Sequence, residues 1–155
     1  MRKTIVRNRS NVKSRTLAPE VAQYVAALHR AVHALGLYLD AALKGEVSQA
    51  EAIVLLHLST AGNSTINEVH KAFLHKRSTL TSVIDRLEAK GLVRRRIGQA
   101  DRRNFQLELT ERGRTSARRV AESIGDLAAV MRVSAADVQC ASIVLERTAG
   151  AAAGG

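Results

Sequence analysis

The chain has 155 residues, and its hydrophobic content of 46% excludes a disordered protein and favours a single folded domain. No apolar run approaches the roughly 18 residues of a membrane-spanning helix, and no apolar stretch of a secretory signal follows the basic N-terminus. The single cysteine excludes an intrachain disulfide, and this is typical of proteins of the reducing cytoplasm, where we expect this one to act.

The formal net charge of +10 is concentrated in two segments. Residues 1–16 hold six basic and no acidic side chains, and residues 76–114 hold eleven basic and five acidic ones. The remainder holds seven basic and nine acidic side chains. Because like charges gathered on one surface repel one another unless a partner offsets them, this distribution indicates a polyanionic partner. The alternative is a basic surface that only keeps the protein in solution.

The N-terminal part of the chain predicts an arm followed by a long helix. Residues 1–18 are polar, basic and without periodicity, so we expect a flexible arm. Pro19 suits the first position of a helix, and Gly45 ends it. Over residues 19–44 the apolar side chains recur at steps of four and three, which predicts a seam that needs a partner surface. The seam consists of Val21, Val25, Leu28, Val32, Leu35, Leu39 and Ala42.

Two shorter helices are predicted next by their start signals. Ser48 with Glu51, and Thr65 with Glu68, each have the spacing of a capping box. A Gly62-Asn63 pair separates the two helices.

The helix after Arg77 has two chemically different faces. Leu80, Val83, Ile84 and Leu87 recur at helical spacing and predict a buried face. Gly91 is expected to end this helix in the left-handed conformation. The opposite face holds Arg77, Ser78, Thr79, Thr81, Ser82, Asp85 and Arg86.

The C-terminal half predicts a hairpin and two further helices. Leu92–Ile97 and Asn104–Leu109 read as two strands with a long tip between them. Thr110 is expected to cap a long helix and Ser134 a short last one, before a frayed Ala/Gly tail from Ala149. The apolar stripes of these helices are Val120, Ile124, Leu127 and Met131, and Val138, Ile143 and Leu145.

The order of a short helix, a Ser/Thr-rich helix, a glycine and an arginine-rich hairpin is typical of a winged helix-turn-helix that reads duplex DNA. Small hydroxyl side chains let a helix approach the major groove and contact phosphates or base edges. Arginines of a hairpin, here including Arg95, suit a narrow minor groove, and we expect Asp101 to pair with one of them and stabilise the wing. The predicted DNA-binding residues are Lys76, Arg77, Ser78, Thr79, Thr81, Ser82, Arg86, Arg94, Arg96, Arg102 and Arg103.

These motifs together resemble the MarR family of bacterial transcription regulators. The detailed resemblance covers residues 47–114. It rests on Gln49 with the following apolar helix, Arg77-Ser78-Thr79-Leu80-Thr81, the run from Asp85 to Val93, Asp101-Arg102-Arg103, and the run from Leu109 to Gly113. Many members carry Arg where this chain has Ser82, so a bidentate guanine contact is not available there. Base specificity would then rest more on Ser78, Thr79, Thr81 and the wing.

The resemblance implies a mainly α-helical fold with a small β-hairpin. A winged-helix lobe over 48–114 would be flanked by dimerisation helices over 19–44 and 115–148, in one domain of residues 19–148 before a disordered tail of residues 149–155. It implies a homodimeric repressor of a pseudo-palindromic operator, often released by a small ligand or an oxidant. The predicted dimer interface contains Val21, Val25, Leu28, Val32, Val138 and Ile143.

Other activities are less well supported by the sequence. A nonspecific DNA-binding protein shares the charge, and a winged helix can also serve as a protein-interaction module. We expect the chain to have no enzymatic activity and to use no cofactor, because the sequence contains no phosphate-binding glycine loop, no metal-ligand set and no nucleophile with a neighbouring base. His29 and His33 have a metal-binding spacing, but without a second cluster we expect no metal site. We expect His57 to line a ligand cleft and Cys140 to be a buried structural cysteine.

Overall fold

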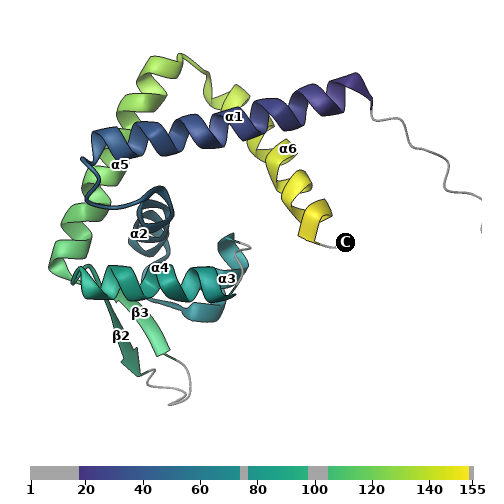
Figure 1. Cartoon of the computed structure of the whole chain (residues 1–155). Helices are drawn as coiled ribbons and strands as arrows, with labels where there is room; N and C mark the ends of the chain where they lie inside the picture. The colour runs from purple at the N-terminus through teal and green to yellow at the C-terminus, as the bar shows by residue number, and fades with distance from the viewer. Residues whose placement is uncertain (1–17, 74–76, 98–104, 154–155) are drawn as a thin grey trace, which may run out of the picture. The chain divides into compact units, whose positions relative to one another are not determined.

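The computed structural model describes residues 18–73, 77–97 and 105–153 (Figure 1). The chain divides into two compact units, residues 1–34 and Leu35–Gly155. The described part of the first unit is helical, and its side chains are exposed or half-buried. The predicted arm of residues 1–18 lies outside the described residues except for Ala18, so it stays a prediction.

The described residues form six helices and three strands. The sequence predicted all six helices. In chain order the elements are α1 (Pro19–Ala42), α2 (Gln49–Ala61), β1 (Ser64–Thr65), α3 (Ile66–Phe73), α4 (Arg77–Ala89), β2 (Val93–Ile97), β3 (Phe105–Leu109), α5 (Glu111–Met131) and α6 (Ala135–Ala153). The mainly α-helical fold with a small sheet is therefore confirmed.

The predicted helix starts are present as hydrogen-bonded caps. The backbone N–H of Ser48 donates to the Glu51 carboxylate at 2.7 Å, and the N–H of Glu51 donates back to the Ser48 hydroxyl at 3.4 Å. Thr65 and Glu68 exchange the same two bonds at the start of α3. These capping boxes satisfy backbone donors that the first turn of a helix leaves without a partner.

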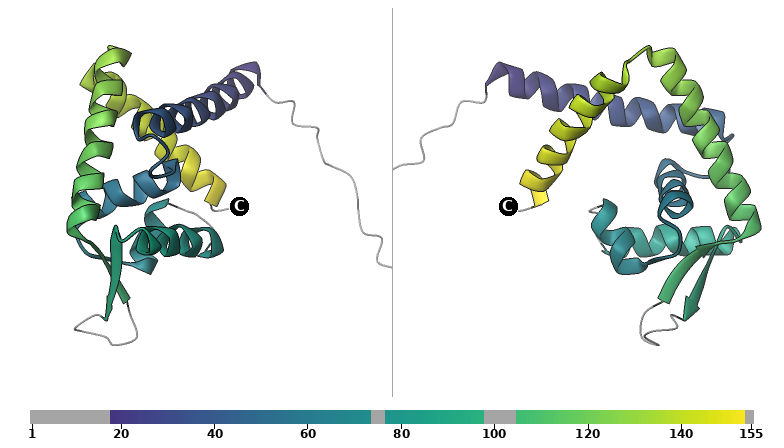
Figure 2. Two further views of the ribbon diagram at one scale, coloured as in Figure 1. Left: turned by 60° about the vertical axis from the view of Figure 1, so that its left-hand side comes forward. Right: turned by 180° about the vertical axis from the view of Figure 1, so that it is seen from behind.

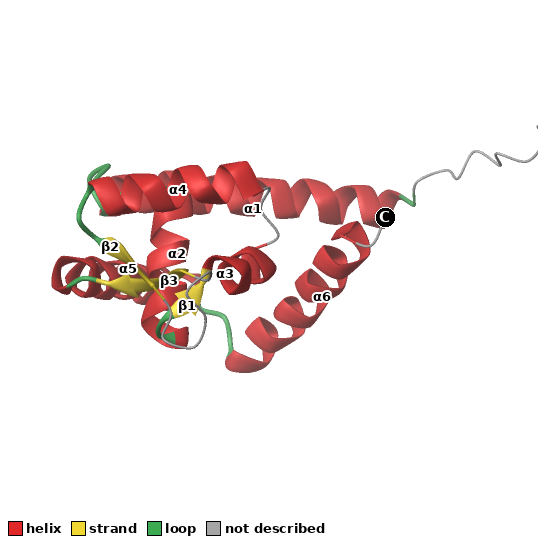
Figure 3. Cartoon of the chain, turned by 90° about the horizontal axis from the view of Figure 1, so that it is seen from below, coloured by secondary structure: helices red, strands yellow, loops and turns green. Residues whose placement is uncertain are grey.

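The sheet has one strand more than the sequence predicted. Strand order is β1-β3-β2, with β3 antiparallel to both neighbours. The additional strand is β1, in which Ser64 pairs with Leu107 and Thr65 pairs with Gln106. A two-residue strand is too short to show a period-2 pattern, and Thr65 also carries the capping signal of α3, so no local signal marked it. The strands lie together beside α2, α3 and α5 (Figure 3).

The core of the second unit lies among α2, α4, α5 and the sheet (Figures 1 and 2). Leu39 of α1 is completely buried in it, and Leu35 packs against it. The C-terminal part of the predicted seam therefore serves the core of its own chain rather than a partner surface. The largest fully buried side chains are Leu39, Leu55, Leu80, Ile84, Leu87 and Leu107.

The last helix is longer than predicted. Asp137 accepts hydrogen bonds from the backbone N–H and the hydroxyl of Ser134, and α6 then continues to Ala153. The prediction of a disordered tail from Ala149 is wrong for residues 149–153, because alanine has the highest helix propensity of all residues and extends the helix. Residues 154–155 lie outside the description. The predicted boundary at residue 148 is not visible as a change of structure.

Candidate nucleic-acid interface

Helix α4 separates its side chains as the sequence predicted. Leu80, Val83, Ile84 and Leu87 are buried in the core of the second unit. The side chains of Ser78, Thr79, Thr81, Ser82 and Arg86 are exposed. The core contacts fix the helix in place, so its short hydroxyl side chains are held on a rigid outer face, as a helix that enters the major groove requires.

One hydroxyl of this face is bonded within its own helix. The Ser82 hydroxyl donates to the backbone carbonyl of Ser78 at 3.0 Å, so its proton is engaged while its oxygen can still accept. Arg77 is the first residue of α4. Four predicted residues, Lys76, Asp101, Arg102 and Arg103, lie outside the described residues, and their roles stay predictions.

The structure gives Arg86 an intramolecular partner that the sequence analysis missed. Its Nε lies 3.1 Å from Oε1 of Glu51, while Lys90 Nζ lies 2.8 Å from Oε2 of the same carboxylate. Glu51 is only 1% exposed, whereas the Arg86 side chain remains 52% exposed. Arg86 therefore joins α4 to α2 through this ion pair and still borders the surface. The sequence signal was Arg86 and Lys90 at a spacing of four, opposite one acidic residue in an apolar helix.

The pKa of the Glu51 carboxyl lies below its ordinary value. Burial alone would raise this pKa, but the hydrogen bonds from Lys90, the Ser48 backbone and Arg86, together with the charge of Lys90, outweigh burial and lower it. The carboxylate is therefore ionised near neutral pH. It is the negative centre on which the C-terminal half of α4 is anchored.

On the wing, two arginines share one carboxylate. Arg94 and Arg96 alternate with Arg95 along β2, so they lie on the same face, and Arg94 pairs with Glu108 in the register of the sheet. Glu108 Oε2 lies 2.9 Å from Arg94 Nη2 and 3.1 Å from Arg96 Nε. Both arginines remain more than half exposed, so they form a basic surface whose charge Glu108 partly neutralises.

Arg95 faces the opposite side of the hairpin. Its guanidinium pairs with Asp85 and Glu88 of α4, and its side chain is only 27% exposed. The expectation that Arg95 belongs with the DNA-facing arginines of the hairpin is therefore wrong, since the pleat of β2 turns it towards α4. Its ion pairs instead fix α4 to the β2–β3 hairpin.

The predicted interface residues expose apolar surface in the single chain. Val21, Val25 and Val32 of α1 are each about half exposed, and Leu28 is half-buried. In α6, Val138 and Ile143 are also about half exposed. Both groups therefore present apolar side chains that a second chain could cover, and their role in a dimer interface stays a prediction.

Three further predictions concern cysteine and histidine. Cys140 is exposed, so the prediction of a buried cysteine is wrong in the single chain; α6 packs little against the rest of its unit. His29 and His33 are exposed, and within the described ranges no group of three or more His, Cys, Asp or Glu could hold a metal ion. Nε2 of His57 is buried and has no hydrogen-bond partner among the described residues, and the ring centroids of His57 and Phe73 lie 5.2 Å apart in an edge-on contact.

None of the helices in residues 18–73, 77–97 and 105–153 is, by itself, long and apolar enough to cross a membrane. The pair α5 and α6 reaches such a length and composition only together, with a bend of 110° between the two helices.

Comparison with known proteins agrees with this geometry. Residues 46–104 match the model of the MarR family. Over these residues the winged-helix lobe is similar to the MarR family. The chain is 35% identical over 75 residues to the helix-turn-helix transcriptional repressor MdtR of Bacillus subtilis, an alignment that covers 48% of either protein. The chain thus spans about half the length of the curated relatives that it matches.

Solved MarR-type structures share the fold. The PcaV transcriptional regulator of Streptomyces coelicolor, solved with its natural ligand, superposes with a TM-score of 0.72 over 88% of this chain and 99% of PcaV, at 24% identity. Reduced AbfR bound to DNA superposes with a TM-score of 0.68 over 84% of this chain and 92% of AbfR, at 23% identity. At these identities the two likenesses establish the fold of the family.

Proposed function

We propose that this chain is a sequence-specific, duplex DNA-binding transcriptional regulator of the bacterial cytoplasm. The observation that carries the proposal is the exposed hydroxyl face of α4 beside the basic wing, where Thr79 and Thr81 lie on one element and Arg94 and Arg96 on the other. A helix of this kind reads base edges in the major groove, while wing arginines contact the backbone or a narrow minor groove. Related MdtR is a repressor, and AbfR was solved on DNA, which supports this function.

The proposed form is a homodimeric repressor on a pseudo-palindromic operator. Exposed Val21, Val25 and Val32 on α1, and Val138 and Ile143 on α6, supply apolar surface that a second copy would bury. Two α4 helices related by a twofold axis would then enter successive major grooves on one side of the duplex. PcaV was solved with its natural ligand, and this supports an effector for the present chain as well.

We expect the chain to bind the duplex upstream of its own coding sequence more tightly than a scrambled duplex, with two chains per duplex. Fluorescence anisotropy at two salt concentrations measures this, because base contacts survive higher salt better than phosphate contacts do. Thr79→Ala should reduce the discrimination between the duplexes by roughly tenfold, the order expected for one lost base-edge contact. Thr60→Ala, an exposed hydroxyl on α2, is the matched control and should leave it unchanged.

Equal, salt-sensitive binding to both duplexes would instead indicate a nonspecific DNA-binding protein. The absence of any duplex binding would favour a winged helix that binds another protein.

The shared carboxylate of the wing gives a second expectation. Glu108→Gln removes the charge that neutralises Arg94 and Arg96, so we expect tighter binding to every duplex and a salt dependence steeper by about one unit. Affinity measured against salt concentration on both duplexes checks this. Glu111→Gln removes an exposed carboxylate paired with Arg114 and serves as the control. Equal changes in the two variants would show that Arg94 and Arg96 do not contact DNA.

A further inference from the structure

Phe105, at the start of β3, is an aromatic side chain that lies at the surface. The chain contains two phenylalanines, two tyrosines and no tryptophan. Tyr24, Tyr38 and Phe73 are half-buried, whereas Phe105 is 47% exposed. Aromatic side chains contribute most to cores and interfaces, because they bury a large apolar area there. The exposure of Phe105 therefore suits a surface that a partner covers.

The register of the β2–β3 hairpin places Phe105 on the side of the sheet that faces α4. Residues two apart on a strand share a face, and so do residues paired directly across two strands. Phe105 therefore shares the face of the buried Leu107, and Leu107 lies opposite Arg95. The guanidinium of Arg95 pairs with two carboxylates of α4. Phe105 continues this face towards the end of the hairpin that projects beyond α4 (Figure 2).

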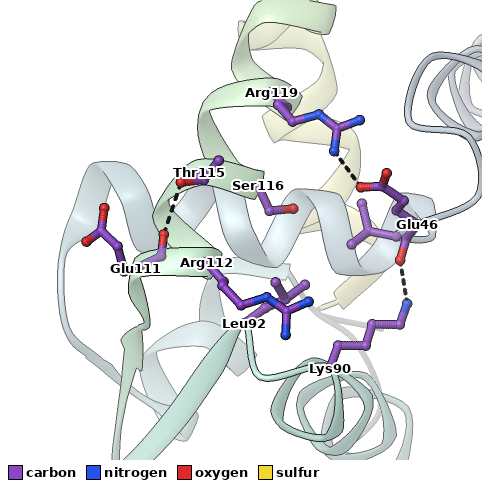
Figure 4. A pocket seen from close by; sticks show the side chains of 9 residues that line it. Glu46, Lys90, Leu92, Glu111, Arg112, Thr115, Ser116 and Arg119 are labelled. Carbon is purple, nitrogen blue, oxygen red and sulfur yellow. Dashed lines mark hydrogen bonds and ion pairs between the residues drawn. The ribbon is translucent and has the colours of Figure 1, made fainter.

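The base of the hairpin is fixed, so its Phe105 face keeps a defined position beside α4. At the end of α4, Lys90 Nζ donates to the backbone carbonyl of Glu46 at 2.9 Å, close to Leu92 just before β2 (Figure 4). The backbone N–H of Thr110, just after β3, donates to the carbonyl of Leu92 at 3.0 Å and closes the base. Together with the ion pairs of Arg95, these bonds hold the hairpin in one orientation to α4.

In the proposed function, on which this inference rests, Phe105 lies against one strand of the duplex. The backbone of each DNA strand separates a major groove from a minor groove. With α4 in the major groove and the hairpin at the neighbouring minor groove, the strand between them passes the side of the hairpin that faces α4. Arg94 and Arg96 lie on the opposite side of the hairpin, towards the other strand.

The chemistry of the phenyl ring selects the sugar of this strand and not its phosphate. The ring has neither a charge nor a hydrogen-bond donor to offer a phosphate. Deoxyribose presents carbon atoms along the same strand, and an aromatic ring packed on them removes apolar surface from water. We infer that Phe105 packs against deoxyribose rings of the strand between the two grooves. This contact is independent of base sequence, so it adds affinity for every duplex and helps to set the position of the hairpin on the DNA.

The contact can be measured directly by fluorescence. Because the chain contains no tryptophan, Phe105→Trp introduces a single one, and quenching by acrylamide reports its exposure. We expect the quenching constant to fall by about threefold or more when a duplex binds, since a covered ring is closed to the quencher. Leu37→Trp, at an exposed position of α1, is the control, and its quenching constant should not change when the duplex is added.

The dependence of affinity on salt separates an apolar contact from a charged one. Phe105→Ala should weaken binding to the upstream and the scrambled duplex by about fivefold each, and should leave the salt dependence unchanged. Phe105→Leu keeps an apolar side chain and should retain most of the affinity. Arg96→Gln should instead lower the salt slope by about one unit, because a phosphate contact is lost. Fluorescence anisotropy at several salt concentrations measures all three variants.

The outcomes distinguish this contact from the proposed function. A tryptophan at position 105 that stays equally open to acrylamide on a bound duplex would overturn the sugar contact and leave the proposed function intact. A loss of salt slope in Phe105→Ala equal to that in Arg96→Gln would also overturn it, because the ring would then act only by holding arginines in place. A wild-type chain that binds no duplex would overturn the proposed function and the contact together.

Discussion

Gly113→Ala is expected to lower the free energy of unfolding by about 3 kcal/mol or more, among the largest effects of a single substitution. A Cβ atom at position 113 would lie 1.9 Å from the backbone carbonyl oxygen of Leu92 and 2.9 Å from its carbonyl carbon. Backbone atoms cannot rotate away as a side chain would, so α5 and the start of β2 would have to separate. Chemical denaturation followed by circular dichroism measures the loss.

The reason for this close approach is the joint between α5 and the wing. Thr110 caps α5 by accepting from the backbone N–H of Gly113, and its own hydroxyl donates to the carbonyl oxygen of Gly91 at 2.7 Å. The backbone N–H of Thr110 also donates to the carbonyl of Leu92. These bonds hold the first turn of α5 against the Gly91-Leu92 segment that links α4 to β2, and only glycine fits at position 113.

Gly125 provides the matched control on the same helix. An added Cβ there meets no heavy atom within 4 Å. Gly125→Ala should therefore stabilise the protein by about 0.5–1 kcal/mol, because alanine loses less backbone entropy than glycine in a helix. A Gly113→Ala variant that unfolds like the wild type would contradict the packing at this joint.

Local sequence signals predicted most of the fold. Interactions within a few residues determine the helix caps at Ser48, Thr65 and Thr110 and the left-handed conformation of Gly91. A local sequence pattern is therefore enough to predict them. The buried face of α4 was predicted for the same reason, since helical periodicity decides which side meets the core.

The candidate site was predicted less completely, because its charges are paired across the fold. The partner of Arg86 lies 35 positions away, on α2. Arg94 and Glu108 meet only through the register of the hairpin, and the pleat decides that Arg95 turns to α4 while its two neighbours do not. A run of three arginines cannot reveal which of them a strand turns towards the core. Gly113 likewise gives no local signal, because the carbonyl it must accommodate belongs to another element.

Glu51→Gln is expected to lower the free energy of unfolding by about 2 kcal/mol at neutral pH. The buried carboxylate accepts from Arg86 at 3.1 Å, from Lys90 at 2.8 Å and from the Ser48 backbone at 2.7 Å. Glutamine keeps the volume but offers one acceptor, and its amide group would face a cation. The loss stays moderate because Arg86 and Lys90 are partly exposed and water can solvate them. Glu122→Gln, on the exposed side of α5, is the control and should change stability by less than about 0.5 kcal/mol.

The pH dependence of the difference in unfolding free energy between the wild type and Glu51→Gln tests whether the charge of Glu51 causes that difference. The folded state lowers the pKa of Glu51 below its ordinary value of 4.5, so the unfolded chain takes up the proton first as the pH falls. The stabilising contribution is therefore complete above pH 4.5 and is lost as the pH falls through the lower pKa of the folded state. Denaturation of the wild type and of Glu51→Gln should differ most near pH 7 and converge in acid. A difference that stays constant down to pH 3 would mean that Glu51 stabilises the fold by packing and not by its charge.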